Sequence, residues 1–157
     1  MATPDHELDA PPWRRFESTL MATSRSIRSL YDDALRELDL SLTEALLMAY
    51  VDHHGAMSQT AVADRLGITR AAVTGIVEKL LSRRLIDRAV DPADGRRKLV
   101  TITKTGRVVV ERISAIDLEL RAELRRGLPK ADRAELAQIL LQIQRNVARM
   151  QAGSSPA

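Results

Sequence analysis

The chain has 157 residues, 45% of them hydrophobic, with 24 basic and 21 acidic side chains and a formal net charge of +3, which suits one domain or a compact two-lobed unit. Because it has no cysteine, the chain cannot form disulfides, thiolate metal sites or thiol-based oxidant sensors, and its 3% aromatic content argues against a base-stacking platform for single-stranded nucleic acid. It has no long apolar run and no signal peptide, so we expect a cytoplasmic protein without a membrane partner.

The first 55 residues predict a flexible arm and two helices. Residues 1–11 form the arm, which includes three acidic side chains. Apolar residues then recur at steps of three, four and seven, the pattern of a long amphipathic helix: Trp13, Phe16, Leu20, Ile27, Tyr31, Ala34 and Leu38. Ser41 followed by Glu44 is a capping box, so the next helix should begin there and run toward Gly55.

A helix-turn-helix pattern comes next. Ser58 can cap a helix, and Gly67 follows the last apolar residue of that helix, where a departing chain often needs a positive φ. The apolar face of the helix consists of Val62, Ala63 and Leu66. Thr69 can cap a second helix two residues after Gly67, which leaves room only for a tight turn.

The second helix of this pattern has two distinct faces. Its buried face should consist of Val73, Ile76, Val77 and Leu80. Its other face opens with small or hydrogen-bonding residues, namely Arg70, Ala71, Thr74 and Gly75. These residues stand at the positive end of a helix, where amides and side chains can approach a phosphate or a base edge. The helices alone leave an ordinary soluble helical hairpin open as the alternative.

A basic hairpin follows the second helix. Residues 85–90 and 98–103 are short extended runs, and residues 91–95 between them are dense in turn formers. Three cations follow the turn at once: Arg96, Arg97 and Lys98. Such a tip can contact phosphates and a narrow minor groove, so the hairpin is predicted to be a DNA-binding wing.

Charge is concentrated in the same region. Residues 65–107 contain 11 basic and 4 acidic side chains, whereas residues 41–64 contain 0 and 3. A basic excess over the predicted recognition helix and wing is the electrostatic footprint expected for a duplex DNA partner. A solvated basic face is the alternative interpretation.

Two further amphipathic helices follow the wing, and Gly127-Leu128-Pro129 separates them. Residues 151–157 should be a disordered tail. Three long apolar stripes cannot all be buried on a small winged domain, so we expect a homodimer, with a monomeric helical cap as the alternative. The expected dimerisation residues are Trp13, Phe16, Leu20, Leu136, Ile139, Leu140, Ile143 and Val147.

The segment from Leu40 to Gly106 resembles the winged helix-turn-helix of the MarR (multiple antibiotic resistance regulator) family of bacterial transcription factors. The matching residues are Leu40-Ser41, Gln59-Thr60, Ala63, Leu66-Gly67, Val73-Thr74, Leu85-Ile86, Asp94-x-Arg96, Leu99-Val100, Thr103 and Gly106.

The resemblance implies that the exposed start of the second helix reads the major groove, that Arg96 enters the minor groove and that Asp94 braces the wing. Gly75 often corresponds to a larger polar or basic residue in that family, which implies thinner base readout here. The resemblance also implies a dimer with intertwined terminal helices, and a crevice between these helices and the winged domain that holds small aromatic acids or similar compounds.

The expected fold is mainly α with a small β wing. Residues 40–104 should form the winged helix-turn-helix DNA-binding domain, and residues 12–39 and 105–150 the helical dimerisation region. The expected DNA-binding residues are Ser58, Thr69, Arg70, Ala71, Thr74, Gly75, Lys79, Arg96, Arg97 and Lys98.

Little in the sequence indicates catalysis or metal binding. His53 and His54 are adjacent, so on a helix they point about 100° apart and are poorly placed to share one metal. The sequence contains no nucleophile elbow, phosphate-binding loop or dinucleotide fingerprint. We therefore expect neither an enzyme nor a cofactor.

The sequence thus predicts a transcriptional regulator that binds double-stranded DNA. By resemblance it is a repressor that binds a palindromic operator as a homodimer and is released by a small aromatic or phenolic effector. A winged-helix protein-interaction module and a metal-responsive regulator using His53 or His54 are the alternatives. Salt dependence separates DNA binding from an apolar protein contact, because only DNA binding releases many counterions.

Overall fold

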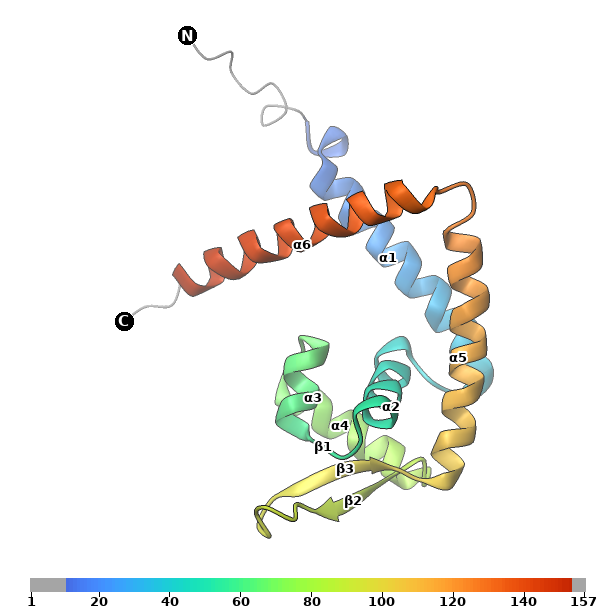
Figure 1. The fold of residues 1–157 in the computed structure, drawn as a ribbon, viewed down its shortest axis with the longest axis vertical. Coiled ribbons are helices and arrows are strands. Elements are labelled where there is room, and N and C mark those ends of the chain that lie inside the picture. The colour runs from blue at the N-terminus through green and yellow to red at the C-terminus, as the bar shows by residue number, and fades with distance from the viewer. Residues whose placement is uncertain (1–10, 154–157) are drawn as a thin grey trace. The chain divides into compact units, whose positions relative to one another are not determined.

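The computed structural model describes residues 11–153 (Figure 1). Its contacts divide the chain into two compact units, one ending at Leu118 and the other beginning at Glu119. The first unit contains η1 (Pro12–Arg14), α1 (Phe16–Leu35), η2 (Arg36–Leu38), α2 (Leu42–His54), β1 (Met57–Ser58), α3 (Gln59–Leu66), α4 (Arg70–Ser82), β2 (Ile86–Val90), β3 (Lys98–Ile102) and most of α5 (Lys104–Leu124). The second unit contains the end of α5 and α6 (Lys130–Gly153). This is the predicted mainly helical fold with a small β wing. The expected arm, apart from residue 11, and residues 154–157 of the expected tail lie outside the described residues. The prediction of a disordered tail from residue 151 is wrong for residues 151–153, because α6 continues through them to Gly153.

The sheet is antiparallel with the strand order β1-β3-β2. β2 and β3 pair from Ile86 opposite Ile102 outward, which confirms the predicted hairpin to within one residue at each end. β1 was not predicted. It has only two residues, and it adds a third strand through the pairing of Ser58 with Leu99.

Local capping explains where the helices of the first unit begin and end. Ser41 and Glu44 make both hydrogen bonds of the predicted capping box at the start of α2. Ser58 and Thr69 each accept a hydrogen bond, at 3.2 Å, from the backbone amide three residues on, and so begin α3 and α4. Gly67 ends α3 at φ +64°, the left-handed conformation that glycine adopts at low cost. All four predicted caps are confirmed.

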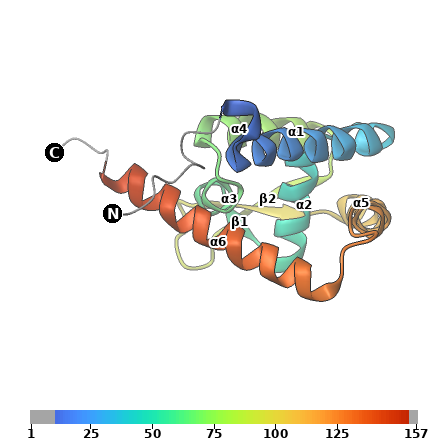
Figure 2. The ribbon, with the colours of Figure 1, turned by 90° about the horizontal axis from the view of Figure 1, so that it is seen from above.

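The core of the first unit lies among α2, α3, α4 and the sheet, and Leu35 of α1 and Val110 and Ile113 of α5 are buried in the same cluster. β3 contacts α2, β1 contacts α3 and β2 contacts α4, so the sheet lies along one side of the three helices; it is below them in Figure 1, and Figure 2 gives the view from above. The predicted inner face of α4 is confirmed: Val73, Val77 and Leu80 are fully buried, and Ile76 is partly buried. The opposite face of α4 is therefore left to solvent.

The joint between the wing and α5 is closely packed. Thr103 donates its backbone N–H to the carbonyl oxygen of Leu85 at 3.2 Å, and its hydroxyl lies 2.8 Å from the carbonyl oxygen of Arg84. The same hydroxyl accepts the backbone N–H of Gly106 at 2.9 Å. Gly106 is buried, and a Cβ added there would lie 1.9 Å from the Leu85 carbonyl oxygen. Only glycine fits at this point of α5.

The second unit is dominated by α6. Gly127, at φ +75°, lies in the break between α5 and α6 that the sequence predicted. No residue of α6 is buried within the single described chain. None of the helices described is long and apolar enough to cross a membrane.

Candidate nucleic-acid interface

The exposed start of α4 is the first part of the candidate interface. α3 and α4 are joined by residues 67–69, so the two helices form a tight helix-turn-helix (Figure 1). Arg70, Ala71, Thr74 and Gly75 are all exposed on the first turns of α4. The positive end of the α4 dipole and free backbone amides therefore accompany these side chains.

Gln59 belongs to the same surface, although the sequence did not indicate it as a site residue. The Thr74 hydroxyl donates to the Gln59 side-chain oxygen at 3.1 Å and also lies 3.0 Å from the carbonyl oxygen of Arg70. This contact crosses from α4 to the first turn of α3. A periodicity argument could not find it, because the two residues are on different helices.

The wing tip is folded by two aspartates. The Asp94 carboxylate accepts the backbone N–H of Arg96 at 3.1 Å, and the Asp94 carbonyl accepts the backbone N–H of Arg97 at 2.8 Å. The Asp91 carboxylate accepts the backbone N–H of Ala93 at 2.9 Å. These bonds hold a compact turn that carries Arg96 and Arg97 and is followed at once by Lys98, the first residue of β3.

The structure separates the predicted DNA-binding cations into two groups. Arg70, Arg96 and Lys98 make no side-chain hydrogen bond or ion pair within residues 11–153, and all three are exposed. Arg97 instead donates to the Ser58 hydroxyl at 2.9 Å, and Lys79 contacts the Glu44 carboxylate. The first group can therefore contact a phosphate or a base, while the side chains of the second group are held by other residues of the protein.

Lys79 connects α4 to α2. Its ammonium lies 3.0 and 3.2 Å from the two carboxylate oxygens of Glu44, which is a buried residue. One turn further on, Arg83 donates to the carbonyl oxygens of Asp39 and Leu38, at 2.6 and 2.8 Å. The last turn of α4 is thus bonded to the segment that leads into α2.

The predicted dimerisation residues lie on solvent-facing surfaces of their respective units. In the first unit Trp13 is 78% exposed and Phe16 is also exposed, with Leu20 partly buried. In α6 the exposed residues of this set are Leu136, Ile139 and Val147, and the partly buried ones are Leu140 and Ile143. These side chains leave much apolar surface in water in a single chain.

The two adjacent histidines pack against each other edge to face, with ring centroids 4.6 Å apart. Arg65 donates to His54 Nε2 at 3.2 Å. Desolvation, together with the charges of Arg65 and His53, lowers the pKa of His54 below the usual value for histidine. Among the described residues no group of three or more histidine, cysteine or acidic side chains could hold a metal ion.

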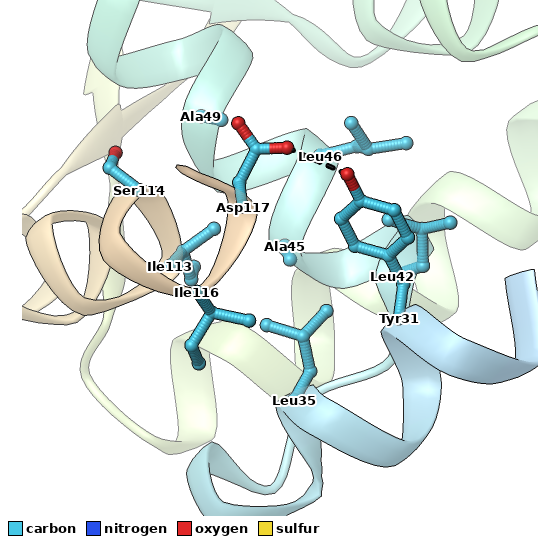
Figure 3. Close-up of a pocket in the computed structure, with 10 residues that line it drawn as sticks. All are labelled: Tyr31, Leu35, Leu42, Ala45, Leu46, Ala49, Ile113, Ser114, Ile116 and Asp117. Atoms are coloured by element: carbon cyan, nitrogen blue, oxygen red, sulfur yellow. Dashed lines mark hydrogen bonds between the residues drawn. The ribbon is translucent and has the colours of Figure 1, made fainter. Parts of the chain in front are cut away.

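A cavity of about 160 Å³ lies within the first unit, between α1, α2 and α5 (Figure 3). Its lining is mainly aliphatic and consists of Tyr31, Leu35, Leu42, Ala45, Leu46, Ala49, Ile113, Ser114, Ile116 and Asp117. The Tyr31 hydroxyl points toward Asp117 and donates to its carboxylate at 2.8 Å. An engineered cavity of similar volume holds one benzene ring, so this one has room for a one-ring compound.

Comparison with known proteins finds one matching family and several solved structures with the same fold. The family described as the MarR family matches residues 38–97, from the end of η2 through the wing tip. The transcriptional regulator PA3341 is 27% identical, with a TM-score of 0.78 over 85% of this chain and 98% of its own. BpsR of Bordetella bronchiseptica, whose DNA binding is regulated by 6-hydroxynicotinic acid, is 25% identical, with a TM-score of 0.73 over 80% and 90%. MepR of S. aureus, solved as a DNA complex, is 22% identical and shares the fold, with a TM-score of 0.78 over 84% and 96%.

Proposed function

This chain belongs to the MarR family of DNA-binding transcriptional regulators, and from that premise we propose that it is a repressor that binds a palindromic operator as a homodimer and is released by a small aromatic effector. The observation that carries the proposal is the group of exposed cations that have no partner within residues 11–153. Arg70 stands at the start of α4, and Arg96 and Lys98 stand on the wing. A helix in the major groove flanked by a basic wing in the minor groove uses such cations directly.

The homodimer is supported by the apolar side chains that each unit leaves in water. Trp13 and Phe16 at the start of the first unit, and the stripe along α6 in the second, are too apolar for a surface without a partner. A second copy of the chain presents the same surfaces, so a twofold dimer can cover them. Such a dimer has two winged helix-turn-helix domains, one from each chain.

Operator recognition can be tested with duplexes selected by the protein from a randomised pool. We expect the selected sequences to be inverted repeats, with half-site centres about 10 base pairs apart, because a twofold protein binds a twofold site. Arg70→Ala should relax the preference at one position of each half-site by about 1–3 kcal/mol, since a bidentate contact from arginine to guanine contributes that order of discrimination. Titration of wild type and variant against the selected duplex and a scrambled one measures the effect.

Glu78 provides the matched control for Arg70. It is on the same helix but is ion-paired with Arg88 of β2, so Glu78→Gln should leave the base preference unchanged. If selection returned no common sequence and binding to duplex DNA did not weaken with salt, the DNA-binding proposal would be wrong. The protein-interaction alternative would then be favoured.

The effector part of the proposal is based on the cavity between α1, α2 and α5. Its size suits one aromatic ring, and the Tyr31 hydroxyl, Ser114 and Asp117 supply polar groups at an otherwise aliphatic lining. The regulation of BpsR by 6-hydroxynicotinic acid, a one-ring compound, supports the same size class. Glu44 lies on the first turn of α2, beside cavity-lining Ala45, so movement of this turn reaches α4 through Lys79.

Phenol is a suitable first probe for the cavity. We expect phenol to weaken operator binding by about 5- to 150-fold at saturation, and operator DNA to weaken phenol binding by the same factor, because coupling between two sites is reciprocal. Calorimetry with and without the selected duplex measures both factors. Ala49→Leu should fill the cavity and abolish the phenol response while leaving DNA binding without phenol unchanged. A protein in which neither phenol nor 6-hydroxynicotinic acid changed DNA affinity would contradict the effector proposal.

A further inference from the structure

We propose that Arg97 is a positioning residue that holds the wing against the start of α3, although its neighbours Arg96 and Lys98 are exposed cations available to DNA. The inference rests on the proposed use of the wing in DNA binding. It assigns different tasks to two consecutive arginines: Arg96 meets the DNA, and Arg97 fixes where Arg96 stands.

Arg97 is bonded within the protein at its backbone and at its side chain. Its backbone N–H donates to the Asp94 carbonyl at 2.8 Å, and its carbonyl accepts the Asp91 N–H at 3.0 Å, so the backbone of Arg97 closes the tip. Its guanidinium donates to the Ser58 hydroxyl at 2.9 Å and lies 4.0 Å from the Asp91 carboxylate. A side chain held in this way would have to break both of these interactions before it could reach a phosphate.

Ser58 is a rigid anchor for this contact. It is only 8% exposed, and its hydroxyl also accepts the Ala61 N–H that begins α3. Its backbone belongs to β1, in register with Leu99 of β3. The Ser58 hydroxyl oxygen therefore joins the start of α3 to the wing tip, and both of its lone pairs accept a hydrogen bond.

The contact fixes the wing beyond the point where the strands support it. β1 ends at Ser58 and β3 begins at Lys98, so residues 91–97 project past the three-stranded part of the sheet. The Arg97 side chain bridges from this projection back to α3. A wing held in one position keeps Arg96 at a fixed distance from α4, which lowers the ordering cost of binding both grooves at once.

The experiment compares Arg97→Gln with Arg96→Gln in the full chain, on a duplex of random sequence and on the selected duplex, over a range of salt concentrations. Each substitution removes one positive charge, so the pair is matched in charge. We expect Arg96→Gln to make the slope of log affinity against log salt shallower by about 0.9 for each phosphate that the protein no longer neutralises. We expect Arg97→Gln to keep the wild-type slope and to weaken binding by about threefold to tenfold, the range for removal of one hydrogen bond.

Substitutions at Ser58 provide a second test of the same hydrogen bond. Ser58→Ala keeps the charge of Arg97 but removes its acceptor, so it should weaken binding at an unchanged slope. Arg97→Gln should then cost little more in the Ser58→Ala background, because both changes break the same hydrogen bond. Ser58→Thr retains a hydroxyl and a good helix cap and should restore binding, which separates this hydrogen bond from a general failure to fold.

Two results would overturn the inference. If Arg97→Gln made the slope shallower by as much as Arg96→Gln, Arg97 would be a phosphate contact. If Arg97→Gln bound both duplexes as tightly as wild type, the hydrogen bond to Ser58 would position nothing. Failure of the proposed function is visible separately, as a wild-type protein whose duplex binding is absent or insensitive to salt, and it would remove the premise of this inference.

Discussion

Gly106→Ala should lower the free energy of unfolding by about 3–5 kcal/mol, in the range reached only by severe packing or backbone conflicts. The added Cβ would lie 1.9 Å from the carbonyl oxygen of Leu85 and 2.9 Å from its carbonyl carbon. Both are backbone atoms, so no side-chain rotation can relieve the overlap. The chain must instead separate the start of α5 from the residue that precedes β2, and break the bonds that Thr103 makes there.

Urea unfolding followed by circular dichroism measures this effect, and Gly75→Ala is the matched control. Gly75 is also helical, but a Cβ there has nothing within 4 Å. The same chemical change should therefore stabilise the protein by about 1 kcal/mol, the difference in helix propensity between glycine and alanine. If the Gly106→Ala protein unfolded at the wild-type urea concentration, the close packing at this joint would be refuted.

Lys79→Met should destabilise the protein by about 3 kcal/mol, because it leaves the Glu44 carboxylate without its cation. The Glu44 side chain is 8% exposed and that of Lys79 is 44% exposed. Water can therefore reach the ammonium side of the pair, which puts the effect at the lower end of the range for buried ion pairs. Methionine and lysine have similar helix propensities, so the effect cannot be assigned to α4 itself.

A double-mutant cycle identifies the source of that destabilisation. Glu44→Gln keeps a side-chain acceptor for the Ser41 backbone amide but removes the charge. In this background Lys79→Met should cost less than about 1 kcal/mol, since no buried charge is left unpaired. Equal costs in the two backgrounds would show that the two side chains do not interact in solution.

The sequence was most informative where structure is set locally. The caps Ser41, Ser58 and Thr69 could be predicted because a hydroxyl at the N-cap position accepts the free amide three residues on. Gly67 could be predicted because a chain that leaves a helix often needs a positive φ. The apolar spacing of α4 likewise determined which face is buried, and hence which face is exposed for a partner. These features depend on neighbours within one or two turns.

The sequence was silent where contacts join distant segments. Lys79 and Arg97 look like surface cations, and only the folded chain brings them to Glu44, 35 residues away, and Ser58, 39 residues away. β1 is too short for alternation to be visible in two residues. The cavity needs three helices, and its Tyr31 and Asp117 are 86 residues apart. Long-range pairing of this kind has no periodic signature.

The open surroundings of Gly75 also have an evolutionary consequence. A side chain can be added at this point of α4 without displacing any atom of the protein, and most residues would improve the local helix. Under the proposed function, operator preference can therefore change by a single codon at no cost to folding. Duplicated copies of the gene could therefore acquire new target sequences through substitutions at Gly75. The buried core would stay under constraint, and so would Gly106 in α5, where only glycine fits.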